Sequence, residues 1–434
     1  PGVLPGGEGT GMSVTLERSG PVDITLRAPA SKSYTHRALV TAGLARGTST
    51  LTRVLRSDDT RITASALQQM GVSLQWEGEQ IRVTGTGGVL QCGEHPVLDM
   101  GDSGTSLRIL TSVALLCQRP VIITGSPRMK ERPVGGLVNA LNSLGGRIQY
   151  LENAGFPPLM VDGTLHGGSV KVDSTVSSQF ASSLLLSAPY AASPLELQLL
   201  PGAVSRSYLD VTVDVMKVFG VPVVREGQDH FVVHPGKGYC GRDYQVEGDY
   251  SSASYFFAIA AVCGGRARVS SLSPGSVQGD RQFLDALAEM GCRVSCSDDC
   301  ITVESDGVLE GIERDLSSSP DTVQTLCMVA ACARSPSRFS GISHLQFKES
   351  NRIFAILSTL QQLGGDVTAG KDGSITIRPA PLHGGTIDPA GDHRTAMSAA
   401  VLGLAVGGIT ITDAGCVSKS FPEFWDILQR DGLV

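Results

Sequence analysis

Six short clusters of serine, threonine, aspartate and glycine each precede a stretch with the pattern of a helix, and three of these clusters also contain basic residues. Such clusters are typical of helix N-caps. The first backbone N–H groups of a helix are unpaired and carry the positive end of its dipole, so this end binds anions. The clusters are SKSYTHR (31–37), GDSGTSLR (101–108), STVSSQF (174–180), EGDYSSAS (247–254), SSPDTVQ (318–324) and GDHRTAM (391–397).

Three of these clusters also carry cations, namely Lys32 with Arg37, then Arg108, and finally His393 with Arg394. A cation near a helix N-terminus opposes the dipole and costs roughly 0.3–1 kcal/mol when it is exposed. The placement becomes favourable when an anion lies between the cation and the helix end. Capping alone explains one isolated cluster, but six together predict a small, multiply charged ligand with phosphate or carboxylate groups. The chain contains no GxxxxGK[ST] motif, so the phosphate would be bound without a P-loop.

Two further segments place cations around a glutamate. They are PRMKERP (127–133) and QFKESNR (346–352). Each alone is explained equally well as a solvated, charged loop. Glu349 stands between Lys348 and Arg352, and its burial decides whether it stays ionised or serves as a proton donor.

The elements that must position these residues recur along the chain. Five copies of an amphipathic helix end in Met, Leu or Phe followed by Gly and then a β-rich run, for example ALQQMGVSLQW and ALAEMGCRVSC. Six helices rich in Ala, Ser, Leu and Val are each followed by a short turn and a strand. A spacing of roughly 70 to 75 residues predicts six α/β units. Periodicity leaves a solenoid, a ring or two three-unit lobes open, and the length of 434 residues favours two lobes.

Composition excludes several classes of protein. A net charge of -7 and an aromatic content of 5% argue against a nucleic-acid partner. No apolar stretch approaches the roughly 18 residues of a membrane span, and no signal peptide is recognisable.

Ten cysteines form no disulfide framework, so the cytoplasm is the expected compartment. Cys292, Cys296 and Cys300 lack a CxxC pair, so no metal site is expected there. Residues 1–11 resemble a tag remnant or a disordered tail.

Nine motifs in order resemble the EPSP synthase (3-phosphoshikimate 1-carboxyvinyltransferase) family, from about Leu16 to Leu428. They are SKSYTHRAL, SGTSLR, PRMKERP, VSSQF, EGDYSSASYF, PDTVQT, FKESNR, GDHRTAMS and SKSFPEFW. The resemblance implies an α/β (α+β) fold with two lobes of the inside-out, barrel-like kind. Each lobe would hold three βαβαββ units around buried parallel helices. One lobe would comprise residues 12–28 and 247–434 and the other 29–246, with crossings near Ala28 and Val246 and substrates bound between the lobes.

The resemblance also implies the reaction. The carboxyvinyl group of phosphoenolpyruvate would pass to the 5-hydroxyl of shikimate 3-phosphate through a tetrahedral intermediate, with loss of phosphate, in chorismate and aromatic amino-acid biosynthesis. Asp321 would accept the hydroxyl proton, Glu349 would protonate the methylene carbon, and Lys32 would be the third catalytic residue. No metal, nucleotide or redox cofactor is implied, and the partners would be the two small-molecule substrates of a monomer.

The implied binding residues form two overlapping sets. Shikimate 3-phosphate would be bound by Lys32, Ser33, Arg37, Ser177, Ser178, Gln179, Ser205, Asp321 and Lys348, with Tyr208 nearby. Phosphoenolpyruvate would be bound by Lys32, Gly104, Arg132, Gln179, Arg352, Arg394 and Lys419.

The chain departs from the family pattern at five positions, which are Asp102 for Asn, Ser350 for Thr, Asn351 for Asp, and His344 and Gln346 for Asn and Arg. None removes a residue with an implied catalytic role. One alternative is UDP-N-acetylglucosamine 1-carboxyvinyltransferase, whose reactive loop cysteine is missing from residues 127–133. RNA-end cyclases use a related unit but need a nucleotide-reactive histidine. A non-catalytic anion-binding relative would be expected to have lost Asp321, Glu349 or Lys32, and all three are present.

Overall fold

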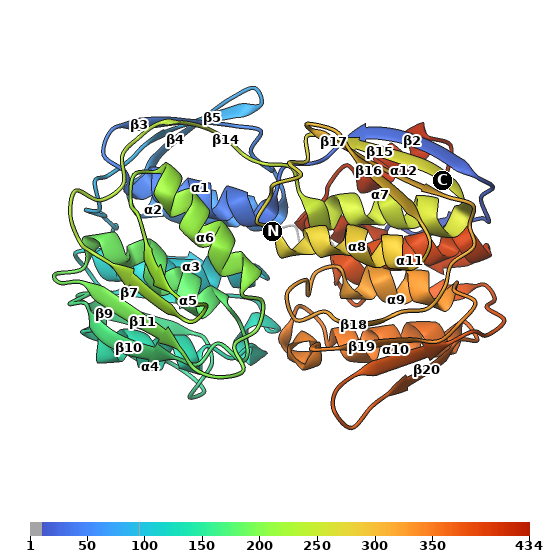
Figure 1. Ribbon diagram of the computed structural model, residues 1–434. Coiled ribbons are helices and arrows are strands. Elements are labelled where there is room, and N and C mark those ends of the chain that lie inside the picture. The colour runs from blue at the N-terminus through green and yellow to red at the C-terminus, as the bar shows by residue number, and fades with distance from the viewer. Residues whose placement is uncertain (1–10, 95) are drawn as a thin grey trace, which may run out of the picture.

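The computed structural model describes residues 11–94 and 96–434, which form two lobes lying side by side (Figure 1). One lobe holds the chain from α1 (Lys32–Leu44) to β14 (Asp243–Gln245). The other holds the later half together with β2 (Val22–Arg27), which Figure 1 shows in blue beside β15 (Gly265–Ser270). Apart from Gly11, the expected tail at residues 1–11 lies outside the described residues.

Helices rich in small residues occupy the interior of each lobe. In α7, every residue from Tyr250 to Ala261 is buried, because alanine and serine side chains let neighbouring helices approach closely. α5 packs against α3 and α1, and α11 packs against α7 and α9. These six helices are α1 (Lys32–Leu44), α3 (Gly104–Val113), α5 (Gln179–Ser187), α7 (Tyr250–Cys263), α9 (Val323–Ala331) and α11 (His393–Val406).

The other helices alternate with these along the chain and bury only one face. In α8, for example, Phe283 and Leu287 are buried while Asp285 and Glu289 are exposed. This is the pattern of an amphipathic helix at a surface. These helices are α2 (Asp58–Gln69), α4 (Gly135–Ser143), α6 (Ser207–Val218), α8 (Gln282–Glu289), α10 (Arg352–Gln362) and α12 (Phe424–Arg430).

The strands of the described residues form six separate sheets, three in each lobe, and no closed barrel. In the unit β6-α3-β7-α4-β8-β9, β6 and β7 pair in parallel, while β9 pairs antiparallel with both β7 and β8. Four further sheets repeat this order, and the sixth has three strands. This confirms the expected two-lobed α/β fold built from βαβαββ units around buried helices.

The strand bounds follow the chain. The first lobe contains β3 (Thr48–Thr52), β4 (Ser73–Glu77), β5 (Gln80–Thr84), β6 (Val97–Asp99), β7 (Val121–Thr124), β8 (Gly146–Tyr150), β9 (Leu159–Gly163), β10 (Gly168–Val172), β11 (Leu195–Leu199), β12 (Val224–Glu226), β13 (His230–Val233) and β14 (Asp243–Gln245). The second contains β1 (Val14–Leu16), β2 (Val22–Arg27), β15 (Gly265–Ser270), β16 (Arg293–Cys296), β17 (Cys300–Ser305), β18 (Glu313–Asp315), β19 (Ser337–Ser340), β20 (Asp366–Ala369), β21 (Ile375–Arg378), β22 (Gly385–Ile387) and β23 (Ile409–Ile411).

Strands from the N-terminal segment complete the C-terminal lobe. β2 pairs in parallel with β15 along six residues, and β1 pairs antiparallel with β23. In the first lobe, the corresponding place beside β3 is taken by β14, which comes from the end of that lobe. The chain therefore has to cross between the lobes twice.

The two crossings run side by side and are hydrogen-bonded to each other. The N–H of Ser31 donates to the carbonyl of Glu247 at 2.7 Å, and the N–H of Asp249 donates to the carbonyl of Pro29 at 2.8 Å. Between them, Ala30 and Gly248 form an antiparallel bridge. A Cβ on Gly248 would lie 2.2 Å from the carbonyl oxygen of Ser271, so only glycine fits this position.

Each lobe has its own hydrophobic core. One core is formed by residues between Tyr34 and Val246, and the other combines Val14 to Ala28 with residues from Tyr250 to Leu428. The division into residues 29–246 and residues 12–28 with 247–434 stays a prediction about independent folding units.

The division can be tested with fragments. Residues 29–246 are predicted to unfold cooperatively as a separate chain, because all three sheets and the core of that lobe come from this range. Residues 247–434 are predicted to fold only with residues 12–28 supplied as a peptide, since β15 and β23 otherwise each lose one of their two neighbouring strands. Near-UV circular dichroism during thermal unfolding measures both. A fragment 247–434 with the same cooperative transition with and without the peptide would contradict the division.

Candidate active site

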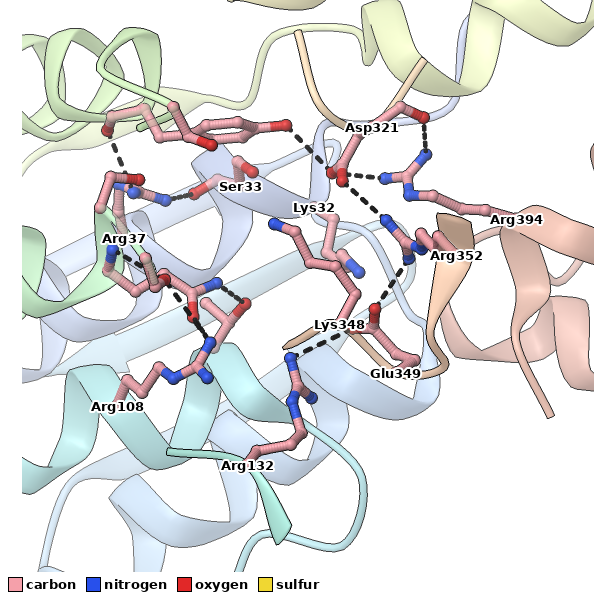
Figure 2. Close-up of a pocket in the computed structure, with 16 residues that line it drawn as sticks. Lys32, Ser33, Arg37, Arg108, Arg132, Asp321, Lys348, Glu349, Arg352 and Arg394 are labelled. Atoms are coloured by element: carbon pink, nitrogen blue, oxygen red, sulfur yellow. Dashed lines mark hydrogen bonds and ion pairs between the residues drawn. The ribbon is translucent and has the colours of Figure 1, made fainter. Parts of the chain in front are cut away.

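A polar cavity lies between the lobes, where helices of both lobes begin. Figure 2 shows the basic side chains of the first lobe facing Asp321, Glu349, Arg352 and Arg394 of the second. Seven of the sixteen lining residues are basic and two are acidic, and both acidic residues come from the second lobe. The lining residues are Lys32, Ser33, Arg37, Thr105, Arg108, Arg132, Ser177, Ser178, Gln179, Ser205, Tyr208, Asp321, Lys348, Glu349, Arg352 and Arg394.

Side-chain caps fix where four of the six buried helices start. Ser103 accepts from the N–H of Ser106 at 3.3 Å, and Asp249 accepts from the N–H of Ser252 at 2.8 Å. Ser31 and Asp392 cap α1 and α11 in the same way. The predicted capping is therefore present at these four helices, whereas the N-cap residues of α5 and α9, Ser178 and Thr322, accept no such bond.

Asp321 lies between two arginines of its own lobe. Its carboxylate oxygens lie 2.7 Å from Nη2 of Arg394 and 3.2 Å from Nη1 of Arg352. Burial alone would raise the pKa of Asp321, but Arg394, Lys348 and Arg352 outweigh it and hold the pKa below its usual range. Asp321 is therefore an ionised carboxylate that can accept a proton and hydrogen bonds.

Glu349 is the second carboxylate of the cavity. Its Oε2 lies 2.7 Å from Nη2 of Arg352, and its Oε1 lies 3.8 Å from Nη2 of Arg132 in the first lobe. Burial would raise the pKa of Glu349, but Arg352, Arg132 and Lys419 hold it well below its usual value. Without anions in the cavity, Glu349 is ionised. Arg128 fixes the backbone beside it by donating to the carbonyl of Glu349 at 3.0 Å.

Arg37 and Arg108 extend from α1 and α3 without an acidic partner within 4.0 Å among the described residues. Arg37 is 1% exposed, and its guanidinium donates only to hydroxyl and carbonyl oxygens, including Oγ1 of Thr212 at 2.7 Å. Burial lowers the pKa of Arg37 to about 10, and burial together with Arg132 lowers that of Arg108 to about 9. Nε and Nη2 of Arg108 and Nε of Arg132 are buried without a hydrogen-bond acceptor. These donors are available to an anion.

Asp59, near the start of α2, holds two lysines from different lobes. Its carboxylate lies 3.1 Å from Nζ of Lys32 and 3.9 Å from Nζ of Lys419. Lys419 also donates to the carbonyl of Asp102 at 2.8 Å. Lys419 therefore lies beside the cavity rather than in its lining, and it is joined to Lys32 through Asp59.

Gly104 begins α3 directly beneath the guanidinium of Arg132. A Cβ at this position would lie 2.6 Å from Nη1 and 2.7 Å from Cζ of Arg132. The absence of a side chain is thus needed for Arg132 to lie flat over the helix start.

Lys348, His344 and His393 lie in or near the cavity, and the pKa of each is lowered. Burial lowers the pKa of Lys348 to about 8, although Asp321 opposes the change. His344 is buried with Nε2 3.5 Å from Oγ of Ser205, and burial together with Lys348 lowers its pKa to about 3. His393 is fully buried, and burial and Lys32 lower its pKa well below the usual value. His393 therefore adds no positive charge at neutral pH, and the expected cation at that position is wrong.

Two of the residues that differ from the family pattern form hydrogen bonds in the second lobe. Asn351 caps α10 by accepting from the N–H of Phe354 at 3.1 Å, which an aspartate would also do. Ser350 donates to Asp392 at 2.9 Å. In the first lobe, Asp102 is exposed, accepts from the hydroxyl of Ser126 and is not part of the cavity lining.

The structure brings thirteen of the fifteen predicted site residues together in the cavity lining, and Gly104 and Lys419 adjoin it. Sequence reasoning missed Thr105, which lines the cavity, and Asp59 and Asp392, which contact residues of the lining. Asp392 is fully buried, lies 2.9 Å from Nε of Arg352 and caps α11. Its place in GDHR was a signal for the cap, but no sequence signal indicated the contact with Arg352 on another element.

Within residues 11–94 and 96–434, no three His, Cys, Asp or Glu side chains gather where they could hold a metal ion. None of the helices in the same ranges has the length and apolar character that a membrane crossing requires.

Comparison with known proteins adds to this geometry. The family model described as EPSP synthase (3-phosphoshikimate 1-carboxyvinyltransferase) matches residues 16–428. A 3-phosphoshikimate 1-carboxyvinyltransferase of Methanoculleus marisnigri is 54% identical over 423 residues, which cover 98% of this chain and 100% of that protein. One of Aliivibrio fischeri is 38% identical and covers 96% of this chain and 99% of its own.

The folded chain is similar to solved structures as well. The structure of EPSP synthase from Acinetobacter baumannii has a TM-score of 0.83 at 27% identity, and the match covers 97% of this chain and 98% of that one. The sequence match from residue 16 to residue 428 confirms the resemblance carried by the nine motifs. The chain belongs to the EPSP synthase (3-phosphoshikimate 1-carboxyvinyltransferase) family.

Proposed function

We propose that the cavity between the lobes transfers the carboxyvinyl group of phosphoenolpyruvate to the 5-hydroxyl of shikimate 3-phosphate and releases phosphate. The observation that carries this proposal is the excess of basic side chains in the lining, with buried Nε and Nη2 donors of Arg108 and Nε of Arg132 left without acceptors. Each substrate carries a carboxylate and a phosphate, which bind the forked donors of arginine well. Binding both substrates in one charged, poorly hydrated site offsets their mutual repulsion and orients them for reaction.

The substrates divide the cavity between them. Shikimate 3-phosphate is assigned to the hydroxyls and cations of the first lobe, together with Asp321 and Lys348. Phosphoenolpyruvate is assigned to the cations around Glu349, where Arg132 and Arg352 come from opposite lobes. The residues assigned to shikimate 3-phosphate are Lys32, Ser33, Arg37, Ser177, Ser178, Gln179, Ser205, Asp321 and Lys348, and those assigned to phosphoenolpyruvate are Lys32, Gly104, Arg132, Gln179, Arg352, Arg394 and Lys419.

The two carboxylates suit the two proton transfers. Asp321 is ionised, so it is the carboxylate that accepts the proton of the attacking hydroxyl, and its ion pairs with Arg394 and Arg352 fix its position. Glu349 is ionised in the empty cavity, but its role as the acid requires a proton. A bound phosphoenolpyruvate places negative charge beside Arg132 and Arg352, which weakens their hold on Glu349 and raises its pKa. Binding of phosphoenolpyruvate thus favours the protonated form of Glu349, which can then act as the proton donor.

The alternatives are less well supported. The UDP-sugar enzyme is not favoured, since the family match is to EPSP synthase and residues 127–133 lack a cysteine. A non-catalytic role does not explain why Asp321, Glu349 and Lys32 are all held by charged partners around one cavity.

The setting of the protein is also a proposal. We assign it to the cytoplasm as a monomer without a metal or an organic cofactor and without a nucleic-acid or membrane partner. All ten cysteines are free thiols, which is typical of a reducing compartment. The net charge of -7 opposes binding to nucleic acid.

The proposed reaction predicts that phosphate is released only when shikimate 3-phosphate and phosphoenolpyruvate are both present, and without added metal. A colorimetric phosphate assay with each substrate omitted in turn measures this. Release with phosphoenolpyruvate and UDP-N-acetylglucosamine instead would move the chain to the alternative activity, and no release with either acceptor would contradict the proposal.

Replacing Asp321 with asparagine is predicted to lower kcat by about 10²–10⁴, the usual contribution of a positioned acid or base. The amide cannot accept the hydroxyl proton, although it is the same size and still accepts hydrogen bonds. Steady-state kinetics with both substrates measures the change. The exposed Asp298 offers a matched control, since Asp298→Asn should leave kcat unaltered. A kcat for Asp321→Asn within threefold of the wild type would exclude the assigned role.

Gly104→Ala is predicted to raise the KM for phosphoenolpyruvate about tenfold, the equivalent of about 1.4 kcal/mol. The new Cβ would lie 2.6 Å from Nη1 of Arg132, and the flexible guanidinium must move away from its position in the cavity. The KM for shikimate 3-phosphate should change much less. Gly20→Ala is the control, because a Cβ at Gly20 meets no atom within 4 Å. Equal effects on both KM values would argue against this placement of phosphoenolpyruvate.

A further inference from the structure

The phenol of Tyr208 lies between two carboxyl groups of the opposite lobe. Tyr208 belongs to α6, and its oxygen is 3.0 Å from Oδ2 of Asp321 and 3.0 Å from Oδ2 of Asp280. Asp280 lies in the short 3-10 helix Gly279–Arg281, and it does not line the cavity. A buried carboxyl group that the proposed reaction leaves unused therefore contacts the proposed base through one side chain.

The contacts of the Tyr208 phenol with Asp280 and Asp321 require a second proton besides that of the phenol. The single proton of a phenol can be donated to only one acceptor. If both carboxyl groups were ionised, one of them would face the lone pairs of the phenol oxygen without a hydrogen bond, which is unfavourable in a buried site. One of the two carboxyl groups must therefore carry a proton.

The surroundings decide which carboxyl group is neutral. Asp321 is ion-paired with Arg394 and Arg352, which stabilise its charge. Asp280 is 4% exposed, and among the described residues no cation lies within 4.0 Å of its carboxyl oxygens. Its Oδ1 has no hydrogen-bond partner, which is tolerable for the carbonyl oxygen of a neutral acid and costly for a carboxylate. The proton belongs on Asp280.

The charged groups that face Asp280 agree with this placement. Burial and the negative charges of Asp321 and Asp249 together raise the pKa of Asp280 to about 8, although Arg394 and the hydrogen bond with Tyr208 act in the opposite direction. Burial, Asp280 and Asp321 also raise the pKa of Tyr208 well above its usual value, so the phenol keeps its proton.

We propose that Asp280 is a positioning residue, a neutral carboxylic acid that donates to the Tyr208 phenol while the phenol donates to the carboxylate of Asp321. The inference rests on the proposed function, in which Asp321 accepts the proton of the attacking hydroxyl. The chain of two hydrogen bonds orients Asp321 and joins the lobes beside the reacting group. When Asp280 loses its proton, Tyr208 faces two carboxylates, and the negative charge of Asp280 disturbs the base.

A direct titration tests the protonation of Asp280 without any substrate. The full chain is labelled with ¹³C at the aspartate carboxyl carbons, and the resonance absent from Asp280→Asn identifies the group. This resonance is expected to titrate near pH 8. A midpoint below pH 5 would overturn the proposal, and because the readout does not depend on turnover, it decides the matter even if the proposed reaction fails.

The kinetic test uses the ratio of kcat/KM for Asp280→Asn to that of the wild type. Asparagine keeps a neutral hydrogen-bond donor at this position, so the ratio should be constant below pH 7 and rise about tenfold by pH 9, as the wild type loses its proton. Titration of Lys348, whose pKa is also about 8, affects both enzymes and cancels in the ratio.

The matched control is Asp285→Asn, the same change at an exposed position of the following helix, and its ratio to the wild type should not vary with pH. A constant ratio for Asp280→Asn would overturn the proposal, since a purely structural role would lower activity equally at every pH. Absence of phosphate release by the wild type would instead count against the proposed function, and the carboxyl titration would still stand.

Discussion

The site depends on the burial of Arg352 among three carboxylates. Its guanidinium is 1% exposed and contacts Asp321, Glu349 and Asp392 at 3.2, 2.7 and 2.9 Å. Burial would lower the pKa of Arg352, but these carboxylates raise it above its usual value. Removing one partner of such a buried group is strongly destabilising, because an uncompensated charge remains. The same contacts place both proposed catalytic carboxylates on either side of one cation.

This arrangement requires both lobes, because each lobe supplies a different part of the site. The second lobe supplies the carboxylates and their arginines, while the first supplies cations and hydroxyl groups without a carboxylate in the cavity lining. Neither half of the site can act alone, so the lobes have to meet in a defined orientation. The paired crossings at Ala30 and Gly248 hold the lobes together at one edge. Contacts such as that of Arg128 with the backbone of Glu349 hold them together across the cavity.

Much of the fold and of the site could be predicted from the sequence, because the repeated units and the helix caps are local sequence patterns. The small-residue helices predicted the buried helices, and the caps at Ser31, Ser103 and Asp392 predicted where helices begin. The pairing of β2 with β15 could not be derived from periodicity, since it joins strands more than 200 residues apart, and it came only from the resemblance. Asp59 and Asp280 were missed because their roles arise from contacts between elements, and the neutral state of His393 depends on burial.

The central claim is that the cavity is charged to receive anions, and that binding them changes the proton affinity of Glu349. Isothermal titration calorimetry of phosphoenolpyruvate binding to the shikimate 3-phosphate complex of the inactive Asp321→Asn variant, in buffers of different ionisation enthalpy at pH 7, measures the protons taken up. The account predicts net uptake of protons, and loss of most of it when Glu349→Gln is added. Binding without proton uptake, or the same uptake in both proteins, would contradict the account.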